Sequence, residues 1–340
     1  MKLLSDKCIH IEYNNHEGGE LIIISLYIRL ILMCLSGYGA FKIYNTNERK
    51  INRIVKNNLM HFIEDKKILN IKEETPNIEN IEIYNWGVQV TLDIAGICGF
   101  EEVEKHKDYL KQLFRAKDVF ISADKGIVKL DIVINPLEDQ DYKYIPTKAT
   151  ELLLGYDFKG QPILADMTVN PHLLITGLSG QGKTGLLRTL ITNIRDADVV
   201  LCNCFEEDFR GFNVKRLYGE DAILEYCQKI MEQDYWHKSP LYLVVEELAT
   251  IKEKKLVNLL KEMLCVCRHY NIFIIGIIQI ATKEELKFKS YFISRLSFKQ
   301  LDSSSYQVVL GAGVEKDLNK REFYCLTNGL YKGRTYTLPY

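Results

Sequence analysis

Short apolar segments alternate with amphipathic stretches throughout the second half of the chain. Runs of about four to eight apolar residues bounded by polar or glycine positions are typical of strands buried on both faces of a sheet. Such runs predict strands at 172–176, 198–202, 241–245, 272–278 and 292–298, with a shorter pair near 322–326 and 335–338. Helical spacing of apolar residues between these runs predicts covering helices, among them 256–267. The alternation therefore predicts an α/β fold with a parallel sheet covered by helices on both faces.

A smaller α/β pattern precedes that sheet. Helical spacing predicts helices at 42–65 and 101–114, and alternation predicts strands at 88–94, 119–122 and 128–134. A polar stretch with Pro136 and Pro146 comes next and is expected to be a linker. We therefore expect an N-terminal segment over 1–44, a small α/β domain with its linker over 45–150, and a larger domain over 151–340.

The N-terminal segment contains a long apolar run, residues 21–41. A transmembrane helix needs about 20 such residues. The one charge in the run, Arg29, costs roughly 2.5–3.5 kcal/mol on insertion scales, which the surrounding leucines and isoleucines offset. A basic flank that begins at Lys42 favours a cytoplasmic location for the rest of the chain. The run predicts a membrane helix, and the alternative is a buried or oligomer-facing helix in a soluble cytoplasmic protein.

Composition narrows the classes of partner and metal. With 44 Lys and Arg against 45 Asp and Glu, the net charge is −1, so any contact with nucleic acid must come from a local patch or from a pore built by several subunits. The nine cysteines lack zinc-site spacing, which favours free thiols in a reduced protein.

The most specific motif comes directly after the strand at 172–176. Residues 177–184, hereafter the P-loop, fit the phosphate-binding template G-x-x-x-x-G-K-[ST]. Its glycines allow successive N–H groups to point at a triphosphate, and the helix that begins after it adds its positive N-terminal dipole. Lys183 is expected to reach the β- and γ-phosphates, and the Thr184 hydroxyl to bind Mg²⁺. The expected nucleotide-binding residues are Gly177, Leu178, Ser179, Gly180, Gln181, Gly182, Lys183 and Thr184.

Two carboxylates end the apolar strand at 241–245, as a Walker B motif requires. The first acid, Glu246, is expected to hold Mg²⁺, and the second, Glu247, to polarise the attacking water. Glu246 is one methylene longer than the usual aspartate. The alternative interpretation is a strand that ends in surface carboxylates.

Three further polar residues are candidates for catalysis. Gln279 ends the strand at 272–278, where its amide can bond to the γ-phosphate or the water. Arg268 ends a helix and is expected to protrude into the site of a neighbouring subunit as an arginine finger, although it could equally favour its own helix dipole. Arg295 is the second candidate finger.

In this order the motifs resemble the FtsK/SpoIIIE DNA translocase family, within the FtsK–HerA class. The resemblance rests on GYDFKGQP at 155–162, PHLLITGLSGQGKT at 171–184, LYLVVEELA at 241–249, CRHYNIFIIGIIQ at 267–279 and FISRLSFKQ at 292–300. The chain departs from the family at Glu246, which stands for Asp, and at Asn203-Cys204-Phe205, which stands for Asp-Pro-Lys.

The resemblance implies a RecA-like ATPase that uses ATP and Mg²⁺, assembles as a hexamer and moves double-stranded DNA without reading its sequence. It also implies that Arg268 acts on a neighbouring subunit. The arrangement of an apolar segment, a basic helix and a small α/β unit resembles the shorter FtsK-like proteins of plasmids and integrative elements. Such proteins act in conjugative transfer or element maintenance at the cytoplasmic face of the bacterial membrane, which implies a relaxase or secretion-channel partner.

Particular residues favour one other function and disfavour another. A nucleotide-gated membrane coupling scaffold with little hydrolysis is favoured by Glu246 and by the missing Asp-Pro-Lys. A GTPase is disfavoured, because Asn319-Lys320-Arg321-Glu322 departs from N-K-x-D in its last position and lies near the C-terminus.

Overall fold

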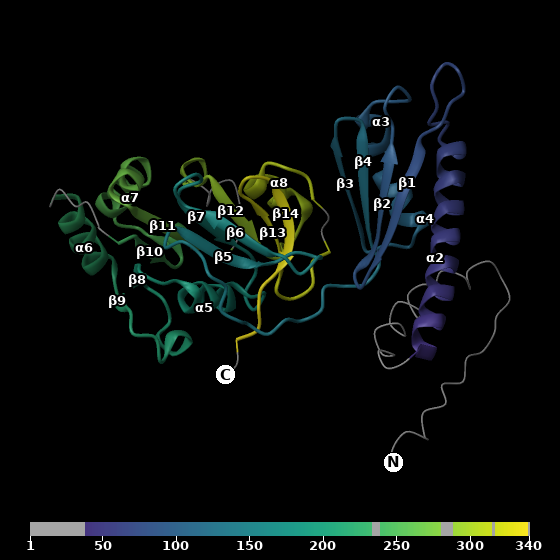
Figure 1. The fold of residues 1–340 in the computed structure, drawn as a ribbon. Helices are drawn as coiled ribbons and strands as arrows, with labels where there is room; N and C mark the ends of the chain where they lie inside the picture. The colour runs from purple at the N-terminus through teal and green to yellow at the C-terminus, as the bar shows by residue number, and fades with distance from the viewer. Residues whose placement is uncertain (1–37, 233–238, 280–287, 315–316, 339–340) are drawn as a thin grey trace, which may run out of the picture. The chain divides into compact units, whose positions relative to one another are not determined.

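A computed structural model of the chain describes residues 38–232, 239–279, 288–314 and 317–338, with side chains from residue 48 (Figure 1). The chain divides into two compact units, residues 1–136 and 137–340, hereafter unit 1 and unit 2. The predicted membrane helix at 21–41 lies outside the described residues except for its last four positions, which begin a helix. Within the described part of the chain, no helix is both long enough and apolar enough to cross a membrane.

Unit 1 is a four-stranded antiparallel sheet with helices on one face. Its strands lie in the order β1-β2-β4-β3, and Val88, Val90 and Leu92 of β2 point toward the helices. Ile51, Val55, Leu59 and Phe62 form the buried stripe of the long helix α2, as the helical spacing predicts. The elements are α2 (Tyr38–Asp65), β1 (Asn77–Tyr84), β2 (Gly87–Asp93), α3 (Phe100–Glu104), α4 (Lys107–Leu113), β3 (Asp118–Asp124) and β4 (Ile127–Val133).

Two details of unit 1 differ from the sequence prediction. The single helix predicted at 101–114 is two helices, because His106 leaves helical geometry at ψ 14° and packs its ring edge-on against Phe62. The strand β1 was not predicted, because it is an edge strand of mostly exposed residues and lacks a fully buried face.

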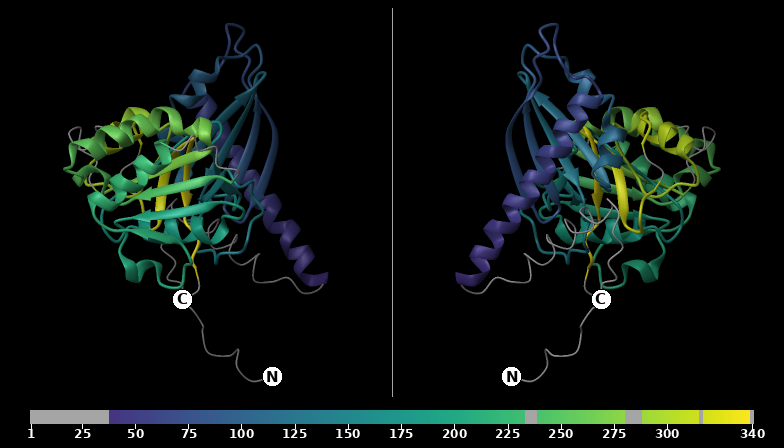
Figure 2. Two further views of the ribbon diagram at one scale, coloured as in Figure 1. Left: turned by 90° about the vertical axis from the view of Figure 1, so that its left-hand side faces the viewer. Right: turned by 90° about the vertical axis from the view of Figure 1, so that its right-hand side faces the viewer.

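Unit 2 contains one ten-stranded sheet, in the order β6-β5-β14-β13-β12-β7-β11-β10-β8-β9 (Figures 1 and 2). The strands from β12 to β9 are parallel, and the other four extend the sheet in antiparallel pairs. The strands are β5 (Glu151–Tyr156), β6 (Pro162–Asp166), β7 (Leu173–Thr176), β8 (Asp198–Cys202), β9 (Lys215–Leu217), β10 (Leu241–Val245), β11 (Ile272–Ile278), β12 (Ser294–Ser297), β13 (Glu322–Leu326) and β14 (Leu330–Arg334). The predicted α/β fold with a large, mostly parallel sheet is confirmed.

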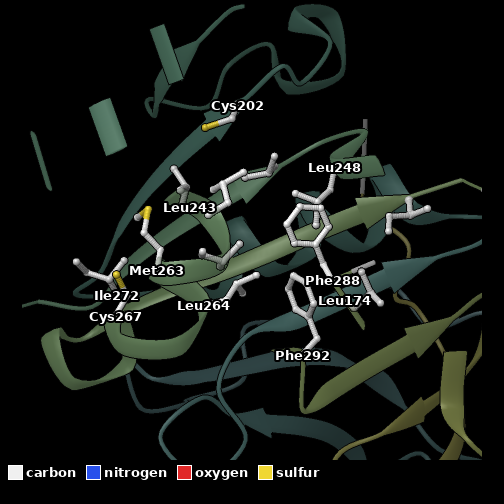
Figure 3. Close-up of a cluster of buried hydrophobic side chains, with 14 of the residues drawn as sticks. Leu174, Cys202, Leu243, Leu248, Met263, Leu264, Cys267, Ile272, Phe288 and Phe292 are labelled. Carbon is white, nitrogen blue, oxygen red and sulfur yellow. The ribbon is translucent and has the colours of Figure 1, made fainter. Parts of the chain in front are cut away.

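Helices cover both faces of this sheet. Helix α5 (Lys183–Asn193) packs on one face, and α6 (Glu220–Glu232), α7 (Lys254–Val266) and α8 (Ser303–Leu310) pack on the other. Figure 3 shows the second face, where Leu243 of β10 lies on the side of Met263 and Leu264 of α7, and Leu174 of β7 lies beside Phe288 and Phe292. Loops and short 3₁₀ turns join these elements, and the turns are η1 (Glu206–Phe209), η2 (Leu248–Thr250), η3 (Cys267–Tyr270) and η4 (Lys289–Tyr291).

The last strand lies earlier than the sequence prediction placed it. The prediction at 335–338 is wrong, because the chain reverses at Gly329, whose carbonyl accepts a hydrogen bond from the Thr327 N–H at 3.0 Å. The paired residues are therefore those of β14, which ends at Arg334.

The stretch 135–150 was assigned to a linker from its composition, but residues 137–150 are part of unit 2. Asn193, at the end of α5, is buried and holds this segment with its side-chain amide. Its Oδ1 accepts hydrogen bonds from the Tyr142 hydroxyl at 3.0 Å and the Ile145 N–H at 3.1 Å. Its Nδ2 donates to the Ile145 carbonyl at 3.0 Å and to Thr147 Oγ1 at 3.2 Å. Polar groups of this segment therefore form specific hydrogen bonds with the end of α5.

We expect the stability of unit 2 to depend on the protonation of His172. Burial lowers the pKa of this side chain from 6.5 to about 4, and its Nδ1 accepts a hydrogen bond from the Ile274 N–H at 3.0 Å. The unfolded chain binds the proton more readily, so stability falls as the pH drops from 6.5 to about 4, by up to about 3 kcal/mol. Hydrogen exchange in β7 and β11 under urea would measure this loss.

His172→Asn is the matched comparison for this measurement. Asparagine tolerates the positive φ of 64° at this position and does not titrate. The difference in unfolding free energy between the native protein and the variant should narrow toward pH 4. An identical pH dependence in both proteins would contradict the prediction.

Candidate nucleotide-binding site

The P-loop joins the end of β7 to the start of α5, as the sequence predicts. Three of its glycines have positive φ angles, 143° at Gly177, 74° at Gly180 and 125° at Gly182. A Cβ at Gly177 would lie only 2.6 Å from the Phe298 Cβ, so this position requires glycine for space as well as for conformation. Because α5 begins directly after the loop, its unpaired N–H groups point toward the same space.

The side chain of Lys183 folds back over the loop. Its ammonium donates hydrogen bonds to the carbonyls of Gly177 at 2.5 Å and Leu178 at 3.0 Å. Burial lowers the pKa of Lys183, and the Glu246 carboxylate opposes that shift. The ammonium is therefore a half-buried cation beside a loop whose glycine-rich geometry is typical of anion-binding loops, where phosphate oxygens could replace the two carbonyls.

Glu246 and Glu247 come directly after β10, a fully buried strand that pairs in parallel with β8 and β11. The Glu246 N–H continues the ladder by donating to the Cys202 carbonyl at 3.0 Å. Burial raises the pKa of Glu246, although a hydrogen bond from the Phe205 backbone opposes the shift. The electrostatic effect of Glu246 on Lys183 indicates that this carboxylate lies near the P-loop.

The second carboxylate turns toward a different partner. Glu247 has a left-handed backbone, with φ 54° and ψ 41°, and its side chain is exposed. Its Oε1 accepts a hydrogen bond of 3.2 Å from Nε2 of Gln279, the residue just after β11. The parallel register of β10 and β11 thus brings together two of the predicted site residues.

The two arginines lie elsewhere. Arg268 is exposed in η3, which precedes β11, and its charge affects the pKa of His172 at the start of β7. It therefore lies at the amino ends of the parallel strands, opposite the P-loop of its own chain. Arg295 lies at the start of β12 and donates from Nε to the Phe292 carbonyl at 2.8 Å and from Nη1 to the Val309 carbonyl at 3.3 Å. One chain alone does not bring either arginine to the P-loop.

Several residues that support the loop were not found from the sequence. Gln300 is buried and donates from Nε2 to Thr176 Oγ1 and to Ser297 Oγ, both at 3.0 Å. The neighbouring Lys299 accepts a hydrogen bond at its carbonyl from the Leu178 N–H at 3.0 Å. These contacts join the P-loop to a segment more than a hundred residues away, and no spacing rule signals them.

The oxygen donors present fit a magnesium–triphosphate complex. In the described part of the chain, no three His, Cys, Asp or Glu side chains are arranged as a metal-binding group. Mg²⁺ bound with a triphosphate usually takes only one or two protein ligands, and phosphate oxygens and waters complete its shell. The Thr184 hydroxyl in the first turn of α5 and the Glu246 carboxylate are hard donors of that kind.

A phosphate loop between a central parallel strand and a helix, with a polar pair at the same edge, defines the RecA-like P-loop ATPase fold. Residues 140–195 match the model of the FtsK/SpoIIIE family. The resemblance to FtsK-like translocases inferred from the sequence is thereby confirmed, and curated relatives support it.

Two relatives illustrate the match. The DNA translocase FtsK of Lactiplantibacillus plantarum is 30% identical over 97 residues, which cover 26% of this chain and 12% of that protein. The DNA translocase FtsK of Staphylococcus aureus is 27% identical over 188 residues, which cover 52% of this chain and 22% of that protein. The match therefore spans less than a quarter of either relative's length.

A solved structure extends the comparison to most of the chain. The pCW3 conjugation coupling protein TcpA, in a monomer form with ATPgS, superposes with a TM-score of 0.50 at 15% identity. The match covers 81% of this chain and 92% of that one. At this identity the likeness shows a shared fold.

Replacing Gly177 with alanine should disrupt the P-loop. The positive φ and the contact with Phe298 should cost about 1–3 kcal/mol of unfolding free energy and remove nucleotide binding. Gly185→Ala is the matched control, because a Cβ there meets no atom within 4 Å and alanine favours the helix. Chemical unfolding and binding of a fluorescent ATP analogue measure both effects. Equal behaviour of the two variants would refute the role assigned to Gly177.

Proposed function

We propose that the chain is the subunit of an ATP-driven DNA translocase. The observation that carries the proposal is the convergence of the P-loop, the Glu246–Glu247 pair and Gln279 at one edge of a parallel sheet. The match to the FtsK/SpoIIIE family supports DNA as the cargo.

Each residue has a proposed role in hydrolysis. Lys183 binds β- and γ-phosphate oxygens, and the P-loop N–H groups orient the triphosphate. Thr184 and Glu246 hold Mg²⁺, which neutralises the charge that develops on the phosphates. Glu247 accepts a proton from the attacking water, and the Gln279 amide fixes the Glu247 carboxylate through their hydrogen bond.

We propose that the site is completed by another subunit of a hexameric ring. Arg268 is exposed at the sheet edge opposite its own P-loop, so its guanidinium is accessible to a neighbouring subunit. Arg295 bonds to backbone carbonyls of its own chain, so Arg268 is the better supported finger. DNA would pass through the ring and be gripped by its phosphates without base contacts.

The proposed setting is conjugative transfer or maintenance of a mobile element at the cytoplasmic face of the membrane. The structurally similar TcpA is named as a conjugation coupling protein, which supports this setting. The apolar run at 21–41 would provide the anchor. A relaxase or a secretion channel would be the protein partner, and double-stranded DNA the cargo.

Removing the ammonium of Lys183 should abolish DNA-stimulated hydrolysis. We expect Lys183→Ala to lower the ATPase rate about 100-fold or more, since a preorganised charge at the phosphates is lost. The native rate should rise when duplex DNA is added, and the stimulation should fall steeply with salt. Lys229→Ala, which removes an exposed ion pair with Glu225 on α6, should leave the rate unchanged. A native rate that is the same with and without duplex DNA would contradict translocation.

The second candidate function is a nucleotide-gated membrane coupling scaffold that hydrolyses little ATP. It is favoured by the burial of Glu246, which raises the pKa of this side chain and so disfavours the anion that would bind a metal, although a hydrogen bond from the Phe205 backbone opposes the shift.

Glu246→Asp distinguishes the two functions. Aspartate would restore the usual length of the metal-binding acid, so a scaffold should gain at least about tenfold in turnover, whereas a working motor should change little. Steady-state ATP hydrolysis with saturating duplex DNA measures the difference. Glu247→Asp, which shortens the neighbouring acid, is the control and should not raise turnover in either case.

A further inference from the structure

Arg321 lies directly against the P-loop, although it follows Thr184 by 137 positions in the sequence. Its N–H donates to the Gln181 carbonyl at 2.9 Å, and its own carbonyl accepts a hydrogen bond from the Thr335 N–H at 3.0 Å. A Cβ placed on Gly182 would come within 3.3 Å of both Cα and Cγ of Arg321. The arginine thus forms part of the wall behind the loop.

The backbone of Arg321 is strained at this point. Its φ of 70° lies in the left-handed region, which glycine adopts freely and a long side chain does not. Strained residues of this kind persist where the surrounding contacts hold them, and such positions gather at functional sites.

Contacts of the Arg321 side chain hold the strained backbone in place. The Arg321 guanidinium forms an ion pair with Asp139 and donates from Nη1 to Thr337 Oγ1 at 2.5 Å. Asp139 forms a second ion pair with Arg334. Arg334 in turn donates to the Leu137 carbonyl at 2.9 Å.

The charges in this group balance. Arg334 also lies 3.7 Å from Glu322, whose carboxylate accepts hydrogen bonds from the backbone and the side chain of Asn319. Two guanidinium groups therefore face two carboxylates. Both arginine side chains are largely buried, with 21% and 15% of their surface exposed. Asp139 is 55% exposed, so of these ion pairs only that of Arg334 with Glu322 is shielded from solvent on both sides.

We propose that Arg321 is a positioning residue of the P-loop and that Asp139 holds Arg321 in place. This inference rests on the proposed function, since it assigns the pair to the ATP site. Arg321 touches the loop at Gln181 and Gly182 and holds the loop backbone in a form that binds phosphate. Asp139 contributes through Arg321, because its carboxylate fixes the guanidinium.

The test compares full-length variants for affinity and stability. We expect Arg321→Gly to weaken binding of a fluorescent ATP analogue about tenfold, as for the loss of a coupled contact. The melting temperature should stay the same or rise, because glycine relieves the positive φ. Asp139→Asn should weaken binding to a similar extent. The double variant should bind no more weakly than Arg321→Gly alone, because both changes remove one interaction. Lys320→Ala, at the exposed neighbouring position, is the matched control and should bind like the native protein.

Two results would overturn the inference. Arg321→Gly could bind the analogue as tightly as the native protein, or it could lose stability without losing affinity, which is the signature of a purely structural ion pair. Failure of the proposed function gives a different pattern, in which the native protein itself does not bind the analogue or Lys183→Ala binds it equally well. A clear loss of affinity in Arg321→Gly with Lys320→Ala unaffected supports the inference.

Discussion

The parallel pairing of β7 with β11 and β12 is the constraint on which the whole site depends. The chain leaves β7 through the P-loop and α5 and continues at β8, on the far side of β11 and β10. The strand order therefore reverses direction at β7, and in open parallel sheets ligands bind at such a point. Because β10 and β11 run parallel to β7, their carboxyl ends meet the P-loop at the same edge. Glu247 and Gln279 reach each other for this reason alone.

The charges of Lys183 and Glu246 depend on two opposing effects, burial and interaction with nearby polar or charged groups. Burial lowers the pKa of Lys183 and raises the pKa of Glu246, so each residue becomes easier to neutralise as it leaves water. The Glu246 carboxylate opposes the shift in the pKa of Lys183, and a hydrogen bond from the Phe205 backbone opposes the shift in the pKa of Glu246. A triphosphate with its metal would bring further charges of both signs to the same place, and would satisfy each residue with a closer partner.

The sequence predicts the parts of this structure that depend on local rules. The P-loop is fixed by glycines and a lysine that lie within eight positions of the chain, and Glu247 and Gln279 were found because each directly follows a buried apolar run. The hydrogen bond between these two side chains was not predicted. The strands β1, β5, β6 and β9 were missed. Three of them, β1, β6 and β9, are edge strands without a continuous buried run. β5 was missed although every residue after Glu151 is buried. The contact of Gln300 with Thr176 was also beyond prediction, since it depends on side chains that meet only after the sheet has formed. The roles of Arg268 and Arg295 stay predictions, because they concern a second subunit.

Both ends of helix α5 are connected by hydrogen bonds and ion pairs to residues 137–150, which precede β5. At its start, the P-loop meets Arg321, which is paired with Asp139. At its end, Asn193 uses both atoms of its amide on Ile145 and adds bonds to Tyr142 and Thr147. A chain shortened to begin at Glu151 would leave a buried amide and two arginines without these partners, and unsatisfied buried groups are costly. The segment that begins at Leu137 therefore belongs structurally to unit 2, and we expect a shortened chain that keeps the P-loop supported to include it.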